Sequence, residues 1–98
     1  MLRIEWKPAA RVDLMSLVDF IAEDSPTNAA LFAADLRLKV QQLSIYPEMY
    51  RLGRKRGTRE MVVHPNYIVI YRVLKKSEVI EILRVKHAAE RWPTTSGL

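Results

Sequence analysis

Positively charged side chains are concentrated in one short segment near the middle of the chain. Residues 51–59 carry five cations, and two glycines lie among them. The five cations are Arg51, Arg54, Lys55, Arg56 and Arg59. Like charges this close repel one another, and a bound anion relieves that repulsion. We therefore interpret the segment as a basic surface loop that binds an anionic partner, with a solvated loop that has no ligand as the alternative.

Two further arginines, Arg72 and Arg84, fall in segments where apolar and polar residues alternate, as they do in β-strands. Unbroken alternation in the second of these segments puts Arg84 and Lys86 on the same face as Ile82. On this pattern Arg72 and Arg84 are candidates for the floor of a shallow groove that holds an anion.

Carboxylates and imidazoles near these cations have two interpretations. Either Glu60 or Glu81 pairs across neighbouring strands with one of the two groove arginines, on a solvated face. Alternatively, Glu60, His64 and His87 are candidates for acid-base chemistry, because a histidine beside arginines has the proton-transfer range and the cations that phosphate chemistry requires. Two histidines without a recognised ligand spacing fit no standard metal site, so no metal is expected.

Several classes of protein are excluded by what the sequence lacks. It has no cysteine, and it contains no glycine-rich nucleotide-binding fingerprint, no P-loop and no serine-hydrolase motif. We therefore expect no disulfide, thiol nucleophile or cofactor. No apolar run approaches the roughly 18 residues that span a bilayer, and the N-terminus lacks the layout of a signal peptide. A soluble cytoplasmic protein without a membrane partner is expected.

The elements that must position these side chains follow from periodicity, prolines and caps. Ser25 followed by Pro26 is a strong helix-start signal, and Pro47 limits the second helix. The predicted order is a strand at residues 2–6, helices at 8–23 and from 26 to before 47, and strands at 59–63, 67–73 and 79–85. Residues 87–92 are expected to form one helical turn, and 94–98 a flexible tail.

This order predicts one α+β domain over residues 1–98. Two apolar-faced helices with a very short joint form an antiparallel hairpin, which needs the face of a sheet to bury its apolar stripe. The three strands after the basic loop are joined by short polar turns and form an antiparallel meander. The fold class is therefore a β-α-α-β-β-β domain, in which a helical hairpin packs on a mostly antiparallel four-stranded sheet.

Charge divides the chain into unlike halves. The 98 residues have a net charge of +5, but residues 1–50 carry five Lys or Arg against seven Asp or Glu, whereas residues 51–98 carry eleven against four. The first half is thus −2 and the second +7. This asymmetry favours a nucleic acid or an acidic protein segment as the partner.

Taken together, the motifs resemble the RelE/ParE superfamily of type II toxin-antitoxin toxins, also known as plasmid stabilisation proteins, over nearly the whole chain. The resemblance rests on residues 8–14 (PAARVDL), 45–47 (IYP), 57–63 (GTREMVV), 66–73 (NYIVIYRV) and 80–92 (IEILRVKHAAERW). The last of these looks like the ending common among ParE-like members. No single piece is specific, but their order is.

The resemblance implies a toxin that inhibits growth and is neutralised by a cognate antitoxin in a hetero-oligomeric complex. It implies contact with operator DNA only through the antitoxin. The superfamily divides into ParE-like poisons of DNA gyrase and RelE-like ribosome-dependent mRNA endonucleases, and a shared fold does not choose between them. An inactive member that only binds antitoxin and acts as a co-repressor is a third possibility.

Two positions favour the gyrase poison. RelE-like nucleases carry arginines where this chain has Ile68 and Ala88, and those cations are the ones expected to stabilise the transition state. The target or antitoxin contacts expected for a poison lie on the basic loop and at the end of the sheet. They are Arg51, Arg54, Lys55, Arg56, Arg59, Arg72, Arg84, Lys86, His87, Arg91 and Trp92.

A nuclease remains the alternative, and it would need other residues in the catalytic roles. Glu60 or His87 would then act as base or acid, and Arg59 and Arg72 would hold the phosphate. Whether the protein is an enzyme at all is left open by the sequence.

Overall fold

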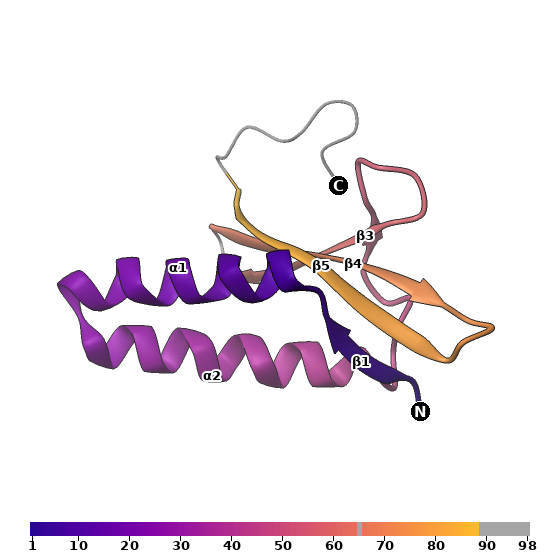
Figure 1. Ribbon diagram of the computed structural model, residues 1–98, viewed down its shortest axis with the longest axis horizontal. Helices are drawn as coiled ribbons and strands as arrows, with labels where there is room; N and C mark the ends of the chain where they lie inside the picture. The colour runs from indigo at the N-terminus through magenta and orange to yellow at the C-terminus, as the bar shows by residue number, and fades with distance from the viewer. Residues whose placement is uncertain (65, 89–98) are drawn as a thin grey trace.

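The computed structural model describes residues 1–64 and 66–88. Its elements are β1 (Arg3–Trp6), α1 (Pro8–Asp24), α2 (Pro26–Gln42), β2 (Arg51–Leu52), β3 (Arg59–His64), β4 (Tyr67–Leu74) and β5 (Val79–His87). The strands form one sheet in the order β1-β5-β4-β3-β2, in which β1 runs parallel to β5 and the other pairs are antiparallel. Figure 1 shows the two helices side by side, covering one part of the sheet.

The α+β class and the element order are confirmed, but the predicted number of four strands is wrong. The strand that was not predicted is β2. It has two residues, which pair with Glu60 and Arg59 of β3. Two residues are too short to show an alternating pattern, so β2 could not be distinguished from the basic loop in the sequence. The chain from 87 to 92 was expected to form a helical turn, but His87 lies in β5 and residues 89–92 lie outside the described residues.

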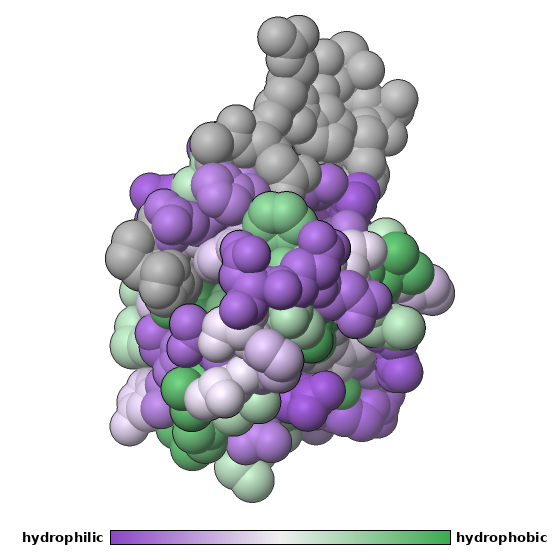
Figure 2. Space-filling view, turned by 90° about the vertical axis from the view of Figure 1, so that its left-hand side faces the viewer, coloured by the Kyte–Doolittle hydropathy of each residue, from purple (hydrophilic) through white to green (hydrophobic). Residues whose placement is uncertain are grey.

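A single residue, Ser25, joins the two helices of the hairpin. Ser25 ends α1 and caps α2, where its Oγ accepts a hydrogen bond of 3.1 Å from the backbone N–H of Asn28. Both helices begin with a proline, whose missing N–H is not needed in the first turn. The hairpin end lies away from the sheet in Figure 1, and Figure 2 shows mainly hydrophilic residues there. None of the described helices is both long and apolar enough to cross a membrane.

The hydrophobic core lies between the hairpin and one face of the sheet. We call this the helix face and the opposite side the open face. The buried core residues are Ala10, Leu14, Leu36, Val40, Leu43, Met61, Val63, Val69, Tyr71, Ile80, Ile82 and Val85. Their spacing on the helices and their alternation on β4 are what the sequence predicted.

The alternation on β5 is broken by a β-bulge, and here the prediction from sequence is wrong. Ile82 pairs with Tyr71 and Arg84 pairs with Ile70, so Leu83 is an extra residue between them. After the bulge, the side chains of β5 alternate between the two faces with a shift of one residue. Ile82 and Val85 therefore both face the helices, whereas Arg84 turns to the open face with Ile70. Arg84 and Ile82, predicted to share a face, lie on opposite ones.

Candidate functional site

A cationic groove on the open face collects basic side chains from four parts of the chain. It has a volume of about 660 Å³. Its lining residues are Lys7, Ala9, Lys55, Arg56, Gly57, Thr58, Arg72, Val73, Leu74, Leu83 and Arg84. Five of these residues are cationic, and Ala9, Val73, Leu74 and Leu83 add an apolar surface. The groove therefore suits an anionic ligand that also has apolar surface.

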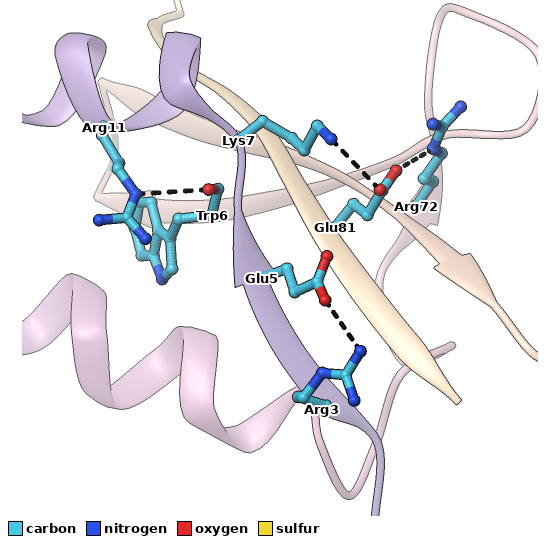
Figure 3. Close-up of polar contacts among 7 residues, drawn as sticks. All are labelled: Arg3, Glu5, Trp6, Lys7, Arg11, Arg72 and Glu81. Atoms are coloured by element: carbon cyan, nitrogen blue, oxygen red, sulfur yellow. Dashed lines mark hydrogen bonds and ion pairs between the residues drawn. The ribbon is translucent and has the colours of Figure 1, made fainter. Parts of the chain in front are cut away.

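Glu81 lies between two of the groove cations. Its Oε1 is 2.6 Å from Arg72 Nε, and its Oε2 is 3.6 Å from Lys7 Nζ. Figure 3 shows Lys7 and Arg72 approaching the carboxylate from its two sides. The hydrogen bond from Arg72 lowers the pKa of Glu81 below its ordinary value, against the opposing effect of burial. The predicted cross-strand pair is confirmed for Arg72 and Glu81, and it holds the Arg72 side chain at the groove.

Arg84 has a different carboxylate partner, which comes from α1. Asp13 Oδ2 accepts hydrogen bonds from Arg84 Nε at 2.7 Å and from the backbone N–H of Val85 at 3.0 Å, and its Oδ1 accepts one from Arg84 Nη2 at 3.0 Å. The register of β1 with β5 ends at Trp6 opposite Ile82. Asp13 therefore satisfies a strand N–H that lies beyond the end of the neighbouring strand, and it fixes the direction of Arg84.

The basic loop is folded around Glu60, which is 3% exposed. Glu60 Oε1 accepts a hydrogen bond of 2.9 Å from Arg51 Nη2, and its Oε2 accepts one of 2.9 Å from the backbone N–H of Arg54. Gly53 packs so closely on Thr58 that a methyl group there would collide with the threonine side chain. Gly57 has a φ of 81°, a conformation that favours glycine. These contacts place Lys55 and Arg56 at the groove.

We expect Glu60→Gln to lower the free energy of unfolding by about 1–2 kcal/mol, because the neutral amide weakens two charge-assisted hydrogen bonds in a buried position. Hydrogen exchange at the Arg54 amide should become faster, since that amide loses its carboxylate acceptor. Urea denaturation and amide exchange measure the two effects. Glu23→Gln is the matched control, because Glu23 is exposed on α1 and has no side-chain partner in the described part of the chain. Equal stability losses in the two variants would contradict the prediction.

Several predicted site residues lie away from the groove. Arg59 pairs with Tyr71 in the sheet, on the helix face, and its Nη1 donates to the backbone oxygen of Tyr50 at 2.7 Å. Arg59 and Arg72 are therefore not brought together as a phosphate clamp. His87 also lies toward the helices, where its ring makes an edge contact with Tyr67 at 5.2 Å between centroids.

The other predicted residues are placed as follows. Lys86 pairs with Ile68 on the open face but does not line the groove. Arg51 and Arg54 contact Glu60, and the backbone of His64 is part of β3. Arg91 and Trp92 lie outside the described residues. The structure thus brings together Lys55, Arg56, Arg72 and Arg84 from the predicted set.

Two residues that position the site were not found by sequence reasoning. Lys7 lies between β1 and α1, and only the parallel pairing of β1 with β5 places it beside Glu81. Asp13 lies 71 positions before Arg84 in the chain. It occurs on the polar side of a helix, where carboxylates are commonly solvated. No local pattern marks either residue, because both act through contacts between distant segments.

Comparison with known proteins identifies relatives along nearly the full chain. Residues 4–92 match the family model described as ParE toxin of type II toxin-antitoxin system, parDE. Y4kP of Sinorhizobium fredii (strain NBRC 101917 / NGR234) is 38% identical over 92 residues, which is 93% of each chain. Toxin RelE2 of Caulobacter vibrioides is 35% identical over 89 residues, covering 91% of this chain and 98% of that protein.

Solved structures show a similar fold. In the chromosomal ParDE toxin-antitoxin system from P. aeruginosa, one chain matches with a TM-score of 0.75 and 22% sequence identity, over 89% of this chain and 96% of that one. At this level of identity the match concerns the fold. The helical hairpin on a mostly antiparallel sheet is thus a fold that this chain shares with a chain of that solved system.

Proposed function

Because this chain belongs to the ParE toxin family of type II toxin-antitoxin systems, we propose that it arrests growth by poisoning DNA gyrase and that a cognate antitoxin neutralises it. The cationic groove is the proposed contact region for the target, with Arg56, Arg72 and Arg84 as its principal cations. Antitoxin bound across the groove would compete with the target. Gyrase poisoning of this kind is a binding activity, in which the toxin traps the enzyme without breaking a bond itself.

The observation that carries this proposal is where the acid-base candidates lie. Glu60 is buried beneath the basic loop, with both carboxylate oxygens engaged by Arg51 and Arg54. His87 lies toward the helices beside Tyr67. Neither Glu60 nor His87 lines the groove, and the carboxylate that lies between two groove cations, Glu81, is already held by Arg72 and Lys7. A general base must lie within hydrogen-bond reach of the proton it removes. This arrangement favours binding over phosphodiester cleavage.

The test uses toxin purified with its antitoxin and then separated from it. We expect the free toxin to inhibit gyrase supercoiling and to accumulate cleaved gyrase-DNA complexes, and added antitoxin to reverse both effects. Arg56→Ala removes an exposed groove cation that has no partner in the described residues, and it should weaken inhibition about tenfold. Lys76→Ala removes one exposed charge in the β4–β5 turn, outside the groove, and should leave inhibition unchanged. Unaltered supercoiling at saturating wild-type toxin would refute the proposal.

An mRNA endonuclease is the second candidate. It is favoured by the similarity to Toxin RelE2 and by Arg72 and Arg84 at one groove, since paired arginines can stabilise a phosphate in its transition state. Toeprinting of mRNA on translating ribosomes distinguishes the two functions. Codon-specific cuts that disappear in His87→Ala would identify a nuclease, whereas a gyrase poison should give none.

A further inference from the structure

A second group of cations lies on the opposite side of β1 from the cationic groove. Two shallow hollows flank the Trp6 side chain there. One, of about 320 Å³, is lined by Trp6, Arg11, Leu14, Met15 and Arg37. The other, of about 240 Å³, is lined by Ile4, Trp6, Arg37, Val40 and Gln41. Because Trp6 and Arg37 border both hollows, we treat all eight residues as one surface and call it the Trp6 site.

The cations of the Trp6 site differ from the other basic residues in the first half of the chain. That half has five Lys or Arg residues. Three of them are paired with carboxylates: Arg3 with Glu5, Lys7 with Glu81 and Lys39 with Asp35. The remaining two are Arg11 and Arg37.

Neither of these two arginines has a carboxylate partner in the described part of the chain. Arg11 donates only a long hydrogen bond of 3.4 Å, from Nε to the backbone oxygen of Trp6. Arg37 is exposed on α2 and makes no hydrogen bond or ion pair with any described residue. Among the residues that the structure describes, no acidic side chain lines either hollow. Two guanidinium groups therefore border one surface without a carboxylate partner among the described residues, in a half of the chain whose net charge is negative.

Trp6 offers both apolar area and a hydrogen-bond donor at this surface. Figure 3 shows its ring extending from β1 toward α2, on the same side as the Arg11 guanidinium. The ring is half-buried and packs against the core, but its indole N–H has no acceptor among the described residues. Tryptophan N–H groups usually find a partner when they become buried. Tryptophan and arginine are also among the residue types most enriched at the energetic centres of protein interfaces.

We propose that the Trp6 site binds an acidic segment of the cognate antitoxin, with carboxylates on Arg11 and Arg37 and an apolar side chain against Trp6. This inference rests on the antitoxin part of the proposed function, and it adds a contact surface separate from the cationic groove. A carboxylate matches the planar fork of a guanidinium, and Leu14, Met15 and Val40 provide apolar contact for a neighbouring side chain. Two cations over an apolar floor suit a peptide better than a nucleic acid, which is held by many phosphate contacts.

The affinity of purified toxin variants for the cognate antitoxin tests the proposal. Arg37→Ala should weaken binding about tenfold or more, because a desolvated carboxylate loses its charged partner. Arg37→Lys should recover part of the loss, since it restores the charge without the fork. Lys76→Ala is the matched control, because Lys76 is exposed, has no charged partner among the described residues and does not line the Trp6 site, so this variant should bind antitoxin as the wild type does. Equal affinities of Arg37→Ala and wild-type toxin would overturn the proposal.

A second measurement follows the indole N–H of Trp6 directly. Its nuclear magnetic resonance signal, assigned by its loss in Trp6→Phe, should shift and become protected from solvent exchange when antitoxin binds. Trp6→Phe keeps most of the ring surface, so folding is retained while the donor is lost. An indole signal that stays unchanged in the complex would overturn the proposal.

The two proposals fail in different ways. If wild-type toxin leaves gyrase unaffected but Arg37→Ala loses antitoxin, the gyrase proposal fails and the Trp6 site stands. If Arg37→Ala abolishes gyrase poisoning and retains full antitoxin affinity, the surface belongs to the target and the antitoxin assignment is wrong. If Arg37→Ala instead loses binding to single-stranded DNA or RNA with antitoxin affinity unchanged, the ligand is a nucleic acid and the assignment is equally wrong.

Discussion

Tyr71→Ala is expected to lower the free energy of unfolding by about 3–5 kcal/mol, the usual cost of removing a large buried aromatic side chain. Tyr71 is fully buried at the centre of the core. Its hydroxyl donates a hydrogen bond of 2.8 Å to the backbone oxygen of Pro47. It therefore ties β4 to the segment that follows α2. A loss of this size is a large fraction of the stability of a small domain, and urea denaturation with circular dichroism measures it.

Tyr71→Phe separates the ring from the hydroxyl. It keeps the packing and loses one hydrogen bond, so we expect a cost of about 1–2 kcal/mol. Tyr46→Phe is the control, because Tyr46 is 60% exposed and its hydroxyl should contribute less than about 0.5 kcal/mol. If Tyr71→Ala cost no more than Tyr71→Phe, the ring would not be part of the core as described.

Alkaline pH provides an independent check on Tyr71. Burial raises the pKa of Tyr71 from 10.0 to about 12, although the Arg59 charge opposes the shift. The folded protein therefore holds this proton in a range where the unfolded chain has released it. The resulting stability is fully present below pH 10 and is lost as the pH rises toward about 12. Wild-type protein should lose stability over this range more steeply than Tyr71→Phe, and parallel pH profiles would contradict the assignment.

Asp13→Ala is expected to cost about 2–4 kcal/mol, because it removes the acceptor of three hydrogen bonds at once. The N–H of Val85 is left without a partner in a residue that is 2% exposed. The guanidinium of Arg84 also loses its carboxylate. Asp13→Asn should cost less, since an amide oxygen can still accept from Val85. Thermal or urea denaturation measures both variants.

Asp19→Ala is the matched control for Asp13. Asp19 is exposed on the same helix and has no side-chain partner within the described residues, so its replacement should change stability by less than about 0.5 kcal/mol. A double-mutant cycle of Asp13→Ala with Arg84→Ala should give a coupling energy of about 1–3 kcal/mol. A coupling energy near zero would show that the ion pair contributes nothing to stability.

Local signals made three features predictable from the sequence. These are the two helices, the buried face of β4 and the family. The serine-proline pair at Ser25 and Pro26 marks the joint, and the alternation around Tyr71 marks the buried face of β4. The cations of the groove were also visible by type. Lys55 and Arg56 stand out as part of a dense run, and Arg72 stands out as a charge in an apolar strand.

Other parts of the site depend on geometry that no local pattern encodes. The bulge at Leu83 cannot be detected in the sequence, because leucine fits either face of a strand and the pattern of apolar and polar residues therefore shows no interruption. Arg59 belongs to the cation run by sequence, but its place opposite Tyr71 turns it toward the helices. Asp13 and Lys7 act on segments more than seventy positions away, and only the assembled sheet brings them into contact.

The parallel pairing of β1 with β5 also has a consequence for the order of events during synthesis. Arg3 to Trp6 are synthesised before their partners, Val79 to Ile82, and 76 positions separate each residue from its partner. β1 therefore cannot join the sheet until β5 has been made, and contacts this distant in sequence slow folding. Lys7 and Arg84 meet only at that last step. A growing polypeptide that has not yet reached β5 therefore lacks Leu83 and Arg84, and with them one wall of the cationic groove.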